Sequence, residues 1–235
     1  MAISDKKILG EKNNKDLLSY PEIPYIKFLY REEINSIPVK ENEEKMIWIP
    51  ITDRLLLRND SSKWLVPKLR QTVVNMLVNA AEALPYNYKL KVMSAYISIE
   101  LQQELWNRKM IKTKDANPTI VDPMELEKLN RRYAAYPTKG APHNTGGAVD
   151  VILLDENGHE IDMGSVFRGV GQPSHTRYAE IDDDAKYSRQ ILYWTMVNAG
   201  FLNTNPFEWW HYSYGDRAWA AYAKEQIAFY GGVEE

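Results

Sequence analysis

Apolar residues recur along the chain at two spacings, which predict helices and short strands. Helical spacing marks four segments: 66–84, 99–110, 185–199 and 217–229. Ser98 is placed to cap the second of these helices, and Gly200 to end the third. Continuous or alternating apolar runs predict four strands: 46–51, 90–96, 148–154 and 207–214. The segment 159–163 follows a turn at 155–158, so we expect it to pair back as a hairpin.

Helices and antiparallel strands come in blocks, without the regular strand–helix alternation that builds a parallel sheet. The pattern therefore predicts an α+β fold with a central antiparallel sheet flanked by helices. A chain of 235 residues suits a single domain. Residues 1–18 are charged and rich in asparagine, so we expect a flexible tail there and the folded domain at 19–235. Prolines in 111–140 predict a long loop with a helical piece near 124–132.

Composition excludes several kinds of chemistry. The chain has no cysteine, four histidines and a formal net charge of −3. Without a thiol it has no cysteine nucleophile, cysteine-ligated metal or redox pair, so any metal must be bound by histidines and carboxylates. The mild acidity argues against a nucleic-acid partner. We find neither an apolar run long enough to span a membrane nor a secretory signal pattern, and we expect a cytoplasmic protein without a membrane partner.

A histidine and an aspartate flank a glycine-rich turn in the segment HNTGGAVD, 143–150. Glycine tolerates the backbone angles of a sharp reversal, so the turn is able to bring Asp150 back beside His143. Asp150 also interrupts an apolar run, where an unpaired charge is costly to bury. A bound metal ion would neutralise that charge.

A glutamate and a histidine lie among aromatic residues in the segment FEWWH, 207–211. Positions three apart on a regular strand point to opposite faces. Glu208 and His211 therefore serve one site only if the strand bulges or ends there, as strands often do near active sites.

Together the two segments supply two imidazoles, one carboxylate and a spare glutamate. Two histidines and one carboxylate leave a fourth zinc position open to water, which is typical of catalytic sites. Glu208 would then take the proton of that water as a general base. Each residue also has an ordinary interpretation: His211 as a hydrogen-bonded core residue, Asp150 as a strand-start cap, and Glu208 as a solvated strand residue. The residues alone do not decide between these interpretations and a metal site.

The order HxxGxAxD at 143–150 followed by ExWH at 208–211 resembles the VanX-type D-alanyl-D-alanine dipeptidases, which belong with the lysostaphin and sonic hedgehog zinc folds. Further likeness lies at 162–167, 188–192, 199–201 and 208–217, within a region of about 35–230. The resemblance implies a zinc D,D-dipeptidase-like catalytic domain that hydrolyses a small D-amino-acid dipeptide. It implies one Zn²⁺ held by His143, Asp150 and His211, with Glu208 as the general base, and a cramped pocket that excludes long peptides.

Two positions depart from the family pattern. The family has Tyr-Arg where this chain has Tyr96-Ile97, and that arginine stabilises the oxyanion of the tetrahedral intermediate. The family has aspartate, which binds the substrate's free amine, where this chain has Arg168. We expect Tyr96, Arg168 and Trp210 to contact substrate. The departures leave two alternatives open: a zinc amidase or peptidase shifted to an acidic or N-blocked substrate, and a zinc-binding member with little peptidase activity.

The other two histidines carry weaker signals. His159 lies in a predicted turn and is expected to be exposed. His175 lies in the loop 164–182, which is long enough to border a pocket, although an ordinary loop position remains the simpler interpretation.

Overall fold

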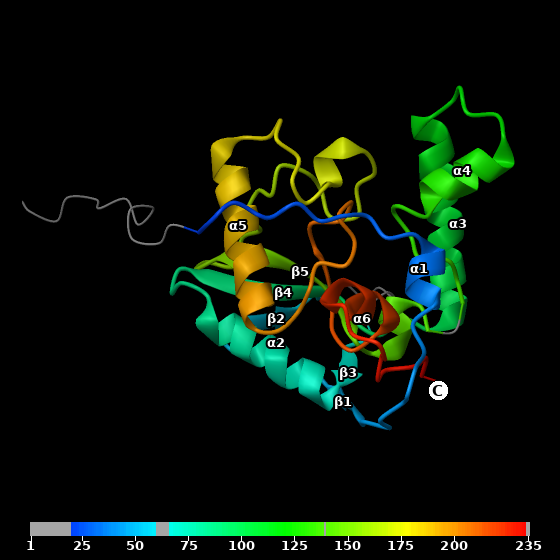
Figure 1. Cartoon of the computed structure of the whole chain (residues 1–235). Coiled ribbons are helices and arrows are strands. Elements are labelled where there is room, and N and C mark those ends of the chain that lie inside the picture. Colours follow the sequence, from blue (N-terminus) through cyan, green and yellow to red (C-terminus); the bar gives the residue numbers. More distant parts are fainter. Residues whose placement is uncertain (1–19, 60–65, 139, 234–235) are drawn as a thin grey trace, which may run out of the picture.

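The computed structural model describes residues 20–59, 66–138 and 140–233 (Figure 1). The predicted tail, 1–18, lies outside these residues. The centre of the fold is a four-stranded sheet in the order β2-β4-β5-β6. Its strands are β2 (Leu55–Leu57), β4 (Tyr88–Ser94), β5 (Ala148–Asp155) and β6 (His211–Ser213). All neighbours are antiparallel except β2, which pairs parallel with β4. The expected α+β fold with a central, mainly antiparallel sheet is confirmed.

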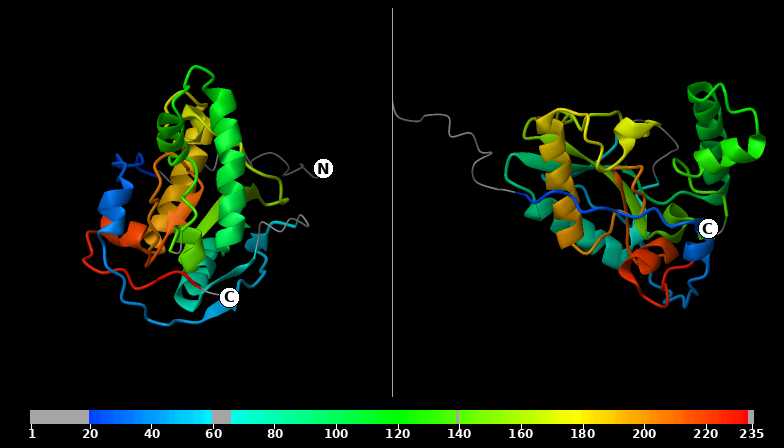
Figure 2. Two further views of the ribbon diagram at one scale, coloured as in Figure 1. Left: turned by 90° about the vertical axis from the view of Figure 1, so that its right-hand side faces the viewer. Right: turned by 45° about the horizontal axis from the view of Figure 1, so that its top comes forward.

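The helices surround this sheet, and a small two-stranded sheet lies beside it. The described helices are α1 (Arg31–Asn35), α2 (Gln71–Ala83), α3 (Ile99–Ala116), α4 (Pro123–Asn130), α5 (Asp183–Asn198) and α6 (Arg217–Ala223). The small sheet pairs β1 (Met46–Trp48) with β3 (Lys68–Arg70). Helices α2 and α5 pack on each other and on the sheet, whereas α3 and α4 lie together at the opposite end (Figures 1 and 2). Apolar residues of α2, α5 and the sheet form one buried cluster.

Strand β5 forms the core of the sheet and explains the odd position of one aspartate. Its first seven residues are buried, as expected for a continuous apolar run that lies between β4 and β6. Asp150 is the charged exception, and it pairs in register with Ser94 of β4 and His211 of β6. The sheet therefore fixes Asp150 where three strands meet.

Two predicted helices are shorter than their hydrophobic pattern indicates. The pattern over 66–84 predicts a helix from its first residue, but α2 begins at Gln71 because Lys68–Arg70 pairs with β1 as strand β3. The pattern over 217–229 continues past the end of α6 at Ala223, where Lys224 adopts a left-handed backbone angle of +60°. The chain then turns back, and Ala228 forms a bridge with Val39.

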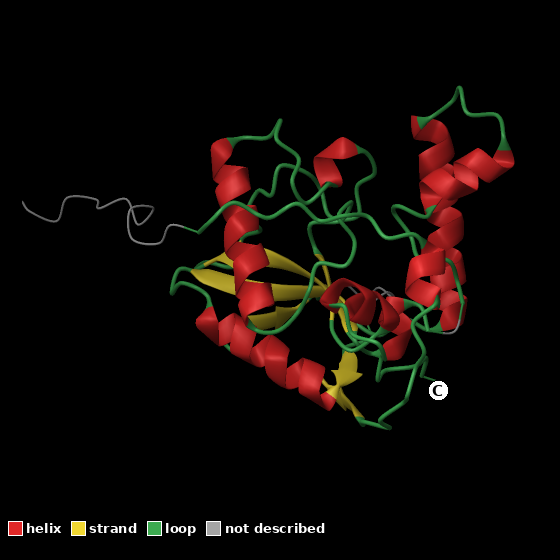
Figure 3. Cartoon of the chain, in the orientation of Figure 1, coloured by secondary structure: helices red, strands yellow, loops and turns green. Residues whose placement is uncertain are grey.

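The long loops also differ from the expectation. Helix α3 continues to Ala116, into the predicted loop 111–140, and α4 supplies the expected helical piece. The chain after β5 does pair back, since the amide of Ile161 donates to the carbonyl of Leu153 at 3.0 Å. Most of the segment from there to α5 is loop, with one short helical turn at Gln172–Ser174 (Figure 3). Among the described residues, no helix combines the length and the apolar composition needed to cross a membrane.

Candidate metal centre

The first candidate ligand, His143, lies in a short helical turn, Pro142–Thr145, that leads into β5. The turn ends at Gly146, whose φ of +71° places it in the left-handed region that favours glycine. The Nδ1 atom of His143 donates to the carbonyl oxygen of Ala95 at 2.8 Å. That hydrogen bond leaves Nε2 facing the sheet, 3.2 Å from the Oδ1 atom of Asp150. A backbone partner on the far nitrogen is the usual way in which proteins orient a metal-binding histidine.

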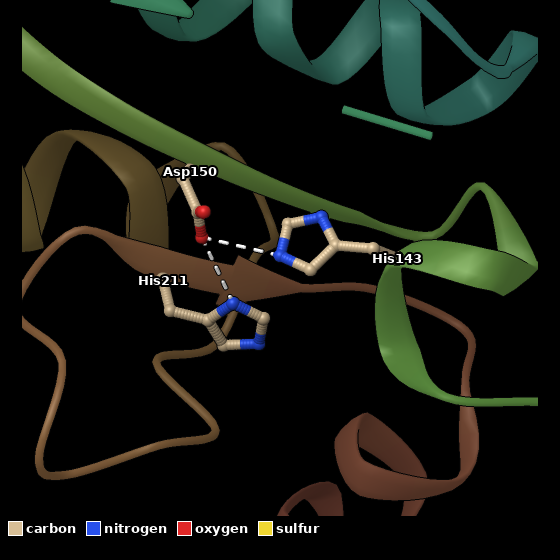
Figure 4. A group of neighbouring side chains, drawn as sticks. All are labelled: His143, Asp150 and His211. Carbon is tan, nitrogen blue, oxygen red and sulfur yellow. Dashed lines mark hydrogen bonds and ion pairs between the residues drawn. The ribbon is translucent and has the colours of Figure 1, made fainter. Parts of the chain in front are cut away.

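The second histidine reaches the same carboxylate from the neighbouring strand. His211 opens β6 opposite Asp150, and its Nδ1 atom lies 3.1 Å from Asp150 Oδ1 (Figure 4). Its Nε2 atom lies 3.4 Å from the hydroxyl of Ser213, which contacts the Thr204 hydroxyl at 3.0 Å. One ligating atom from each of His143, Asp150 and His211 falls within 4.8 Å of the others, and all three residues are buried. Residues distant in the sequence thus converge on one point.

The electrostatics of this group depend on the short distances between its members. Burial alone would raise the pKa of Asp150, but the two imidazoles hold that pKa well below its usual value. Burial tends to lower the pKa of His211, yet its hydrogen bond to Asp150 raises the pKa overall. The buried carboxylate therefore requires a positive partner. A divalent cation between two imidazoles and one carboxylate would satisfy it, so the donor set fits a zinc ion.

The candidate base, Glu208, lies in the turn that precedes β6 and not on the strand itself. The amide of His211 donates to the carbonyl of Glu208 at 3.2 Å, which closes that turn. Asn203 Nδ2 donates to the carbonyls of both Glu208 (2.9 Å) and His211 (2.8 Å). The predicted strand 207–214 is therefore wrong over 207–210, and the expectation that the strand ends at the site is confirmed. The turn allows side chains three apart to face one cavity.

The carboxylate of Glu208 is also positioned by a side chain. Asn205 Nδ2 donates to Glu208 Oε2 at 3.0 Å. Burial raises the pKa of Glu208, while the nearby positive charge of Lys109 acts in the opposite direction. A raised carboxyl pKa brings a general base closer to neutral pH, where proton transfer is most effective.

One cavity of about 750 Å³ brings these groups together. His143, Asp150, Glu208 and His211 all line it. Its outer walls come from α1, α3, α4 and the segments 131–138 and 140–143. This volume is within the range of about 300–1,000 Å³ that holds drug-sized ligands, and the cramped pocket implied by the resemblance stays a prediction.

The expected substrate-contacting residues divide into two groups. Arg168 and Trp210 line the cavity, and Trp210 packs against Phe167 with ring centroids 5.4 Å apart. Tyr96 is buried outside the cavity lining, with its hydroxyl 3.5 Å from the carbonyl of Val233. Its neighbour Ile97 does line the cavity, where it offers an apolar surface. A role for Tyr96 in substrate binding remains a prediction.

The two remaining histidines lie apart from the candidate centre. His159 is 80 % exposed and pairs with Asp155 in the turn after β5, as expected. His175 is half-buried and packs against Phe207 and Tyr133. It does not line the cavity that holds the candidate metal group.

Sequence reasoning missed two polar residues of the site, Lys109 and Asn205. Lys109 is 7 % exposed on α3, and its ammonium donates to the carbonyls of Arg168 (2.9 Å) and Gly169 (3.1 Å). Burial lowers the pKa of Lys109 to about 8, against the opposing effect of Glu208. A lysine in a long helix carries no local signal. Asn205 did carry one, since it lies three residues before Glu208.

The comparison with family models decides what kind of protein carries this site. The model of the family Peptidase_M15, described as D-ala-D-ala dipeptidase, matches residues 51–230. The chain belongs to this family. That membership confirms the family predicted from the two motifs, and with the three-residue candidate metal group it confirms the expected enzyme class, a zinc metallopeptidase.

Two similar dipeptidases agree with this assignment. A D-alanyl-D-alanine dipeptidase of Synechocystis sp. is 27 % identical over 175 residues, which cover 63 % of this chain and 70 % of the relative. A D-alanyl-D-alanine dipeptidase of Escherichia coli is 33 % identical over 81 residues, which cover 34 % of this chain and 42 % of the relative. A solved structure of the vancomycin resistance D,D-pentapeptidase VanY with Zn(II) gives a TM-score of 0.45 at 15 % identity, covering 79 % of this chain and 88 % of that chain.

Proposed function

We propose that this chain hydrolyses the amide bond of a small peptide that contains D-amino acids, such as D-Ala-D-Ala, with one zinc ion and Glu208 as the general base. The observation that carries the proposal is the convergence of a buried two-histidine, one-aspartate group and a half-buried glutamate on one cavity. In a member of the D-Ala-D-Ala dipeptidase family, that convergence supports a catalytic site over a structural metal site.

His143, Asp150 and His211 would hold the metal through Nε2, a carboxylate oxygen and Nδ1, the atoms that already face one another. The bound Zn²⁺ would polarise the scissile carbonyl and lower the pKa of water to about 7. His143 is oriented for this task by Ala95, and His211 by Ser213. Both imidazoles must be neutral on the ligating nitrogen to hold a metal ion, so a bound zinc ion would compete with protons for these residues.

Glu208 supplies proton transfer in this proposal. Its carboxylate would accept a proton from the attacking water and pass that proton to the nitrogen of the departing amine. The hydrogen bond from Asn205 to Oε2 restricts the rotation of the carboxylate, so that Oε1 is the oxygen left to take the proton. The half-buried position of Glu208 strengthens its interaction with the developing charge, compared with the same pair in bulk water.

One observation supports a second candidate function, a member of the family with reduced peptidase activity. Ile97 presents an alkyl side chain to the cavity, so it donates no hydrogen bond to a developing oxyanion. Loss of one such donor typically costs about 10²–10³ in rate. Turnover well below that of the related dipeptidases would favour this candidate.

Metal analysis combined with an activity assay tests the proposal. We expect purified protein to bind one zinc ion and to release D-alanine from D-Ala-D-Ala or from its N-acylated forms. His211→Ala should lose both zinc and activity, whereas the exposed His159 offers a matched control, and His159→Ala should keep both. Zinc retained in His211→Ala would overturn the ligand assignment. A zinc-loaded native protein that cleaves none of these peptides would overturn the proposed function.

A further inference from the structure

The loop that carries Arg168 is held in an unusual conformation. Arg168 has a φ of +58°, in the left-handed region that side chains other than glycine rarely adopt. The amide of the next residue, Gly169, donates to the carbonyl of Val166 at 3.1 Å and closes the turn. The ammonium of Lys109 donates to the carbonyls of both Arg168 and Gly169, which ties this turn to α3. Backbone of this kind persists only where its surroundings hold it, and it clusters at functional sites.

The turn directs the Arg168 side chain toward the candidate metal centre. The guanidinium donates to the hydroxyl of Ser94 at 2.9 Å and lies 5.3 Å from the ring centroid of Phe167. Ser94 pairs across the sheet with Asp150, and side chains of directly opposed residues lie only about 4.5–5.5 Å apart at Cβ. The Arg168 guanidinium therefore contacts the residue directly opposite Asp150, and it lies on the wall of the same cavity.

The cations that line the cavity include a pair that is joined through this turn. Lys109 and Arg168 both line the cavity, and the negative groups that act on Lys109 are Glu208 and Asp150. Under the proposed function Asp150 is neutralised by the metal and Glu208 serves as the base. A cationic group of a ligand beside the Arg168 guanidinium would be repelled. A carboxylate is the ligand group that matches a guanidinium in both charge and shape.

We propose that Arg168, held in place by Lys109, forms a carboxylate-binding subsite for the substrate. The proposal rests on the proposed function, because it uses the same cavity and the same scissile bond. Lys109 is a positioning residue, since it contacts the backbone of the loop, and Arg168 is the residue that binds. Guanidinium has five N–H donors, so Ser94 and a ligand carboxylate can share it. The carboxylate has two possible sources: the C-terminus of the peptide, or an acidic group elsewhere on a longer or N-acylated substrate that the 750 Å³ cavity accommodates.

Three related compounds separate the two sources. N-acetyl-D-Ala-D-Ala amide is neutral, N-acetyl-D-Ala-D-Ala carries only the terminal carboxylate, and N-succinyl-D-Ala-D-Ala amide carries a carboxylate only at the other end. We would measure their dissociation constants by calorimetry with zinc-loaded Glu208→Gln, so that binding is recorded without turnover. We expect one of the charged compounds to bind about 10–100-fold more tightly than the neutral compound, as for a hydrogen bond to a charged group.

Removing the Arg168 charge is the decisive step. Asparagine tolerates the left-handed backbone, so Arg168→Asn should keep the turn. It should reduce the ratio of the dissociation constants of the neutral and the charged compound to about one. Lys109→Met should weaken the preference because the turn loses its tie to α3. Arg131 lines the same cavity from the end of α4 and offers a matched control, and Arg131→Gln should keep the preference.

Each outcome bears on one proposal or the other. A preference that is absent in the native sequence, unchanged in Arg168→Asn, or lost in Arg131→Gln would overturn the carboxylate subsite. Selective binding without release of D-alanine or D-alanine amide by the native protein would overturn the proposed function and leave the subsite standing. Hydrolysis by the native protein without a preference for a charged compound would overturn the subsite and leave the proposed function standing.

Discussion

Asn205 and Glu208 show how a single side chain positions another within the candidate site. The hydrogen bond from Asn205 Nδ2 to Glu208 Oε2 is 3.0 Å long, and Asn205 also donates to the carbonyl of Arg132. It joins the segment after α4 to the turn that carries the base. Glu208 is half-buried, so solvent replaces a lost partner only in part.

We predict that Asn205→Ala lowers kcat about 10–100-fold while KM changes little, because the base loses its orientation and substrate contacts remain. Steady-state kinetics on the best substrate of the D-Ala-D-Ala series would measure this split. Asn157→Ala, in the exposed turn after β5, is the control and should behave like the native protein. An unchanged kcat in Asn205→Ala would remove Asn205 from the positioning of Glu208.

The candidate ligands could be predicted from the sequence because each pair is local. His143 and Asp150 flank one glycine turn, and Glu208 and His211 lie in one aromatic segment. Lys109 could not be predicted, because only the fold brings α3 against a loop about sixty residues away. The sequence also did not show that Tyr96 lies outside the cavity lining. Its direct neighbour Ile97 lines the cavity, and no local pattern distinguishes the two positions.

The turn between the short helix Pro142–Thr145 and β5 is the element on which the centre depends. Gly147 lies between the two candidate ligands His143 and Asp150, and a Cβ atom there would come within 2.4 Å of the carbonyl oxygen of Tyr214. The turn already lies close to the end of β6, since the amide of Tyr214 donates to the Gly147 carbonyl at 2.9 Å. A side chain here would push β5 away from β6.

We predict that Gly147→Ala destabilises the protein by about 1–3 kcal/mol and weakens zinc binding, because overpacking against backbone cannot relax through a side chain. Chemical denaturation and zinc titration would measure the two effects. Gly158→Ala is the matched control: φ is +89° there, but nothing lies within 4 Å of the added Cβ atom. It should cost about 1 kcal/mol through backbone strain and leave zinc affinity unchanged. Normal zinc affinity in Gly147→Ala would contradict this role of the turn.

At the level of elements, periodicity predicted the existence of most helices and strands but not their ends. The apolar spacing of 66–84 fits a helix throughout, yet pairing with β1 converts its first residues into a strand. Strand β2 has only three residues and joins the sheet through parallel pairing with β4, which no local pattern predicts. In both cases, pairing with another strand determined the local structure.

Across the whole molecule, His175 links the loop 164–182 to the rest of the fold and makes stability depend on pH. Burial lowers the pKa of its imidazole, and the charges of Arg132 and Arg189 lower it further. In the unfolded chain a histidine titrates near pH 6.5. Between the two pKa values the unfolded chain binds the proton and the folded chain does not, so the free energy of unfolding decreases as pH falls below about 6.5.

We predict that His175→Gln loses less of its unfolding free energy than the native protein between pH 7 and pH 5.5, because glutamine does not titrate. Urea denaturation of the metal-free proteins at several pH values would measure the difference, and the metal ligands contribute equally to both. A control at exposed His159 should follow the native curve. Identical pH dependence of His175→Gln and the native protein would rule out this contribution.

The fold, the candidate metal group and the nearby glutamate are those of a zinc peptidase of the D-Ala-D-Ala dipeptidase family. The most direct test of the proposed mechanism is D-alanine release by Glu208→Gln, measured against the native protein at equal zinc content. We predict one zinc ion in both proteins and a rate about 10²–10⁴-fold lower in Glu208→Gln, as for loss of a general base. Near-native release of D-alanine by the zinc-loaded variant would contradict the account.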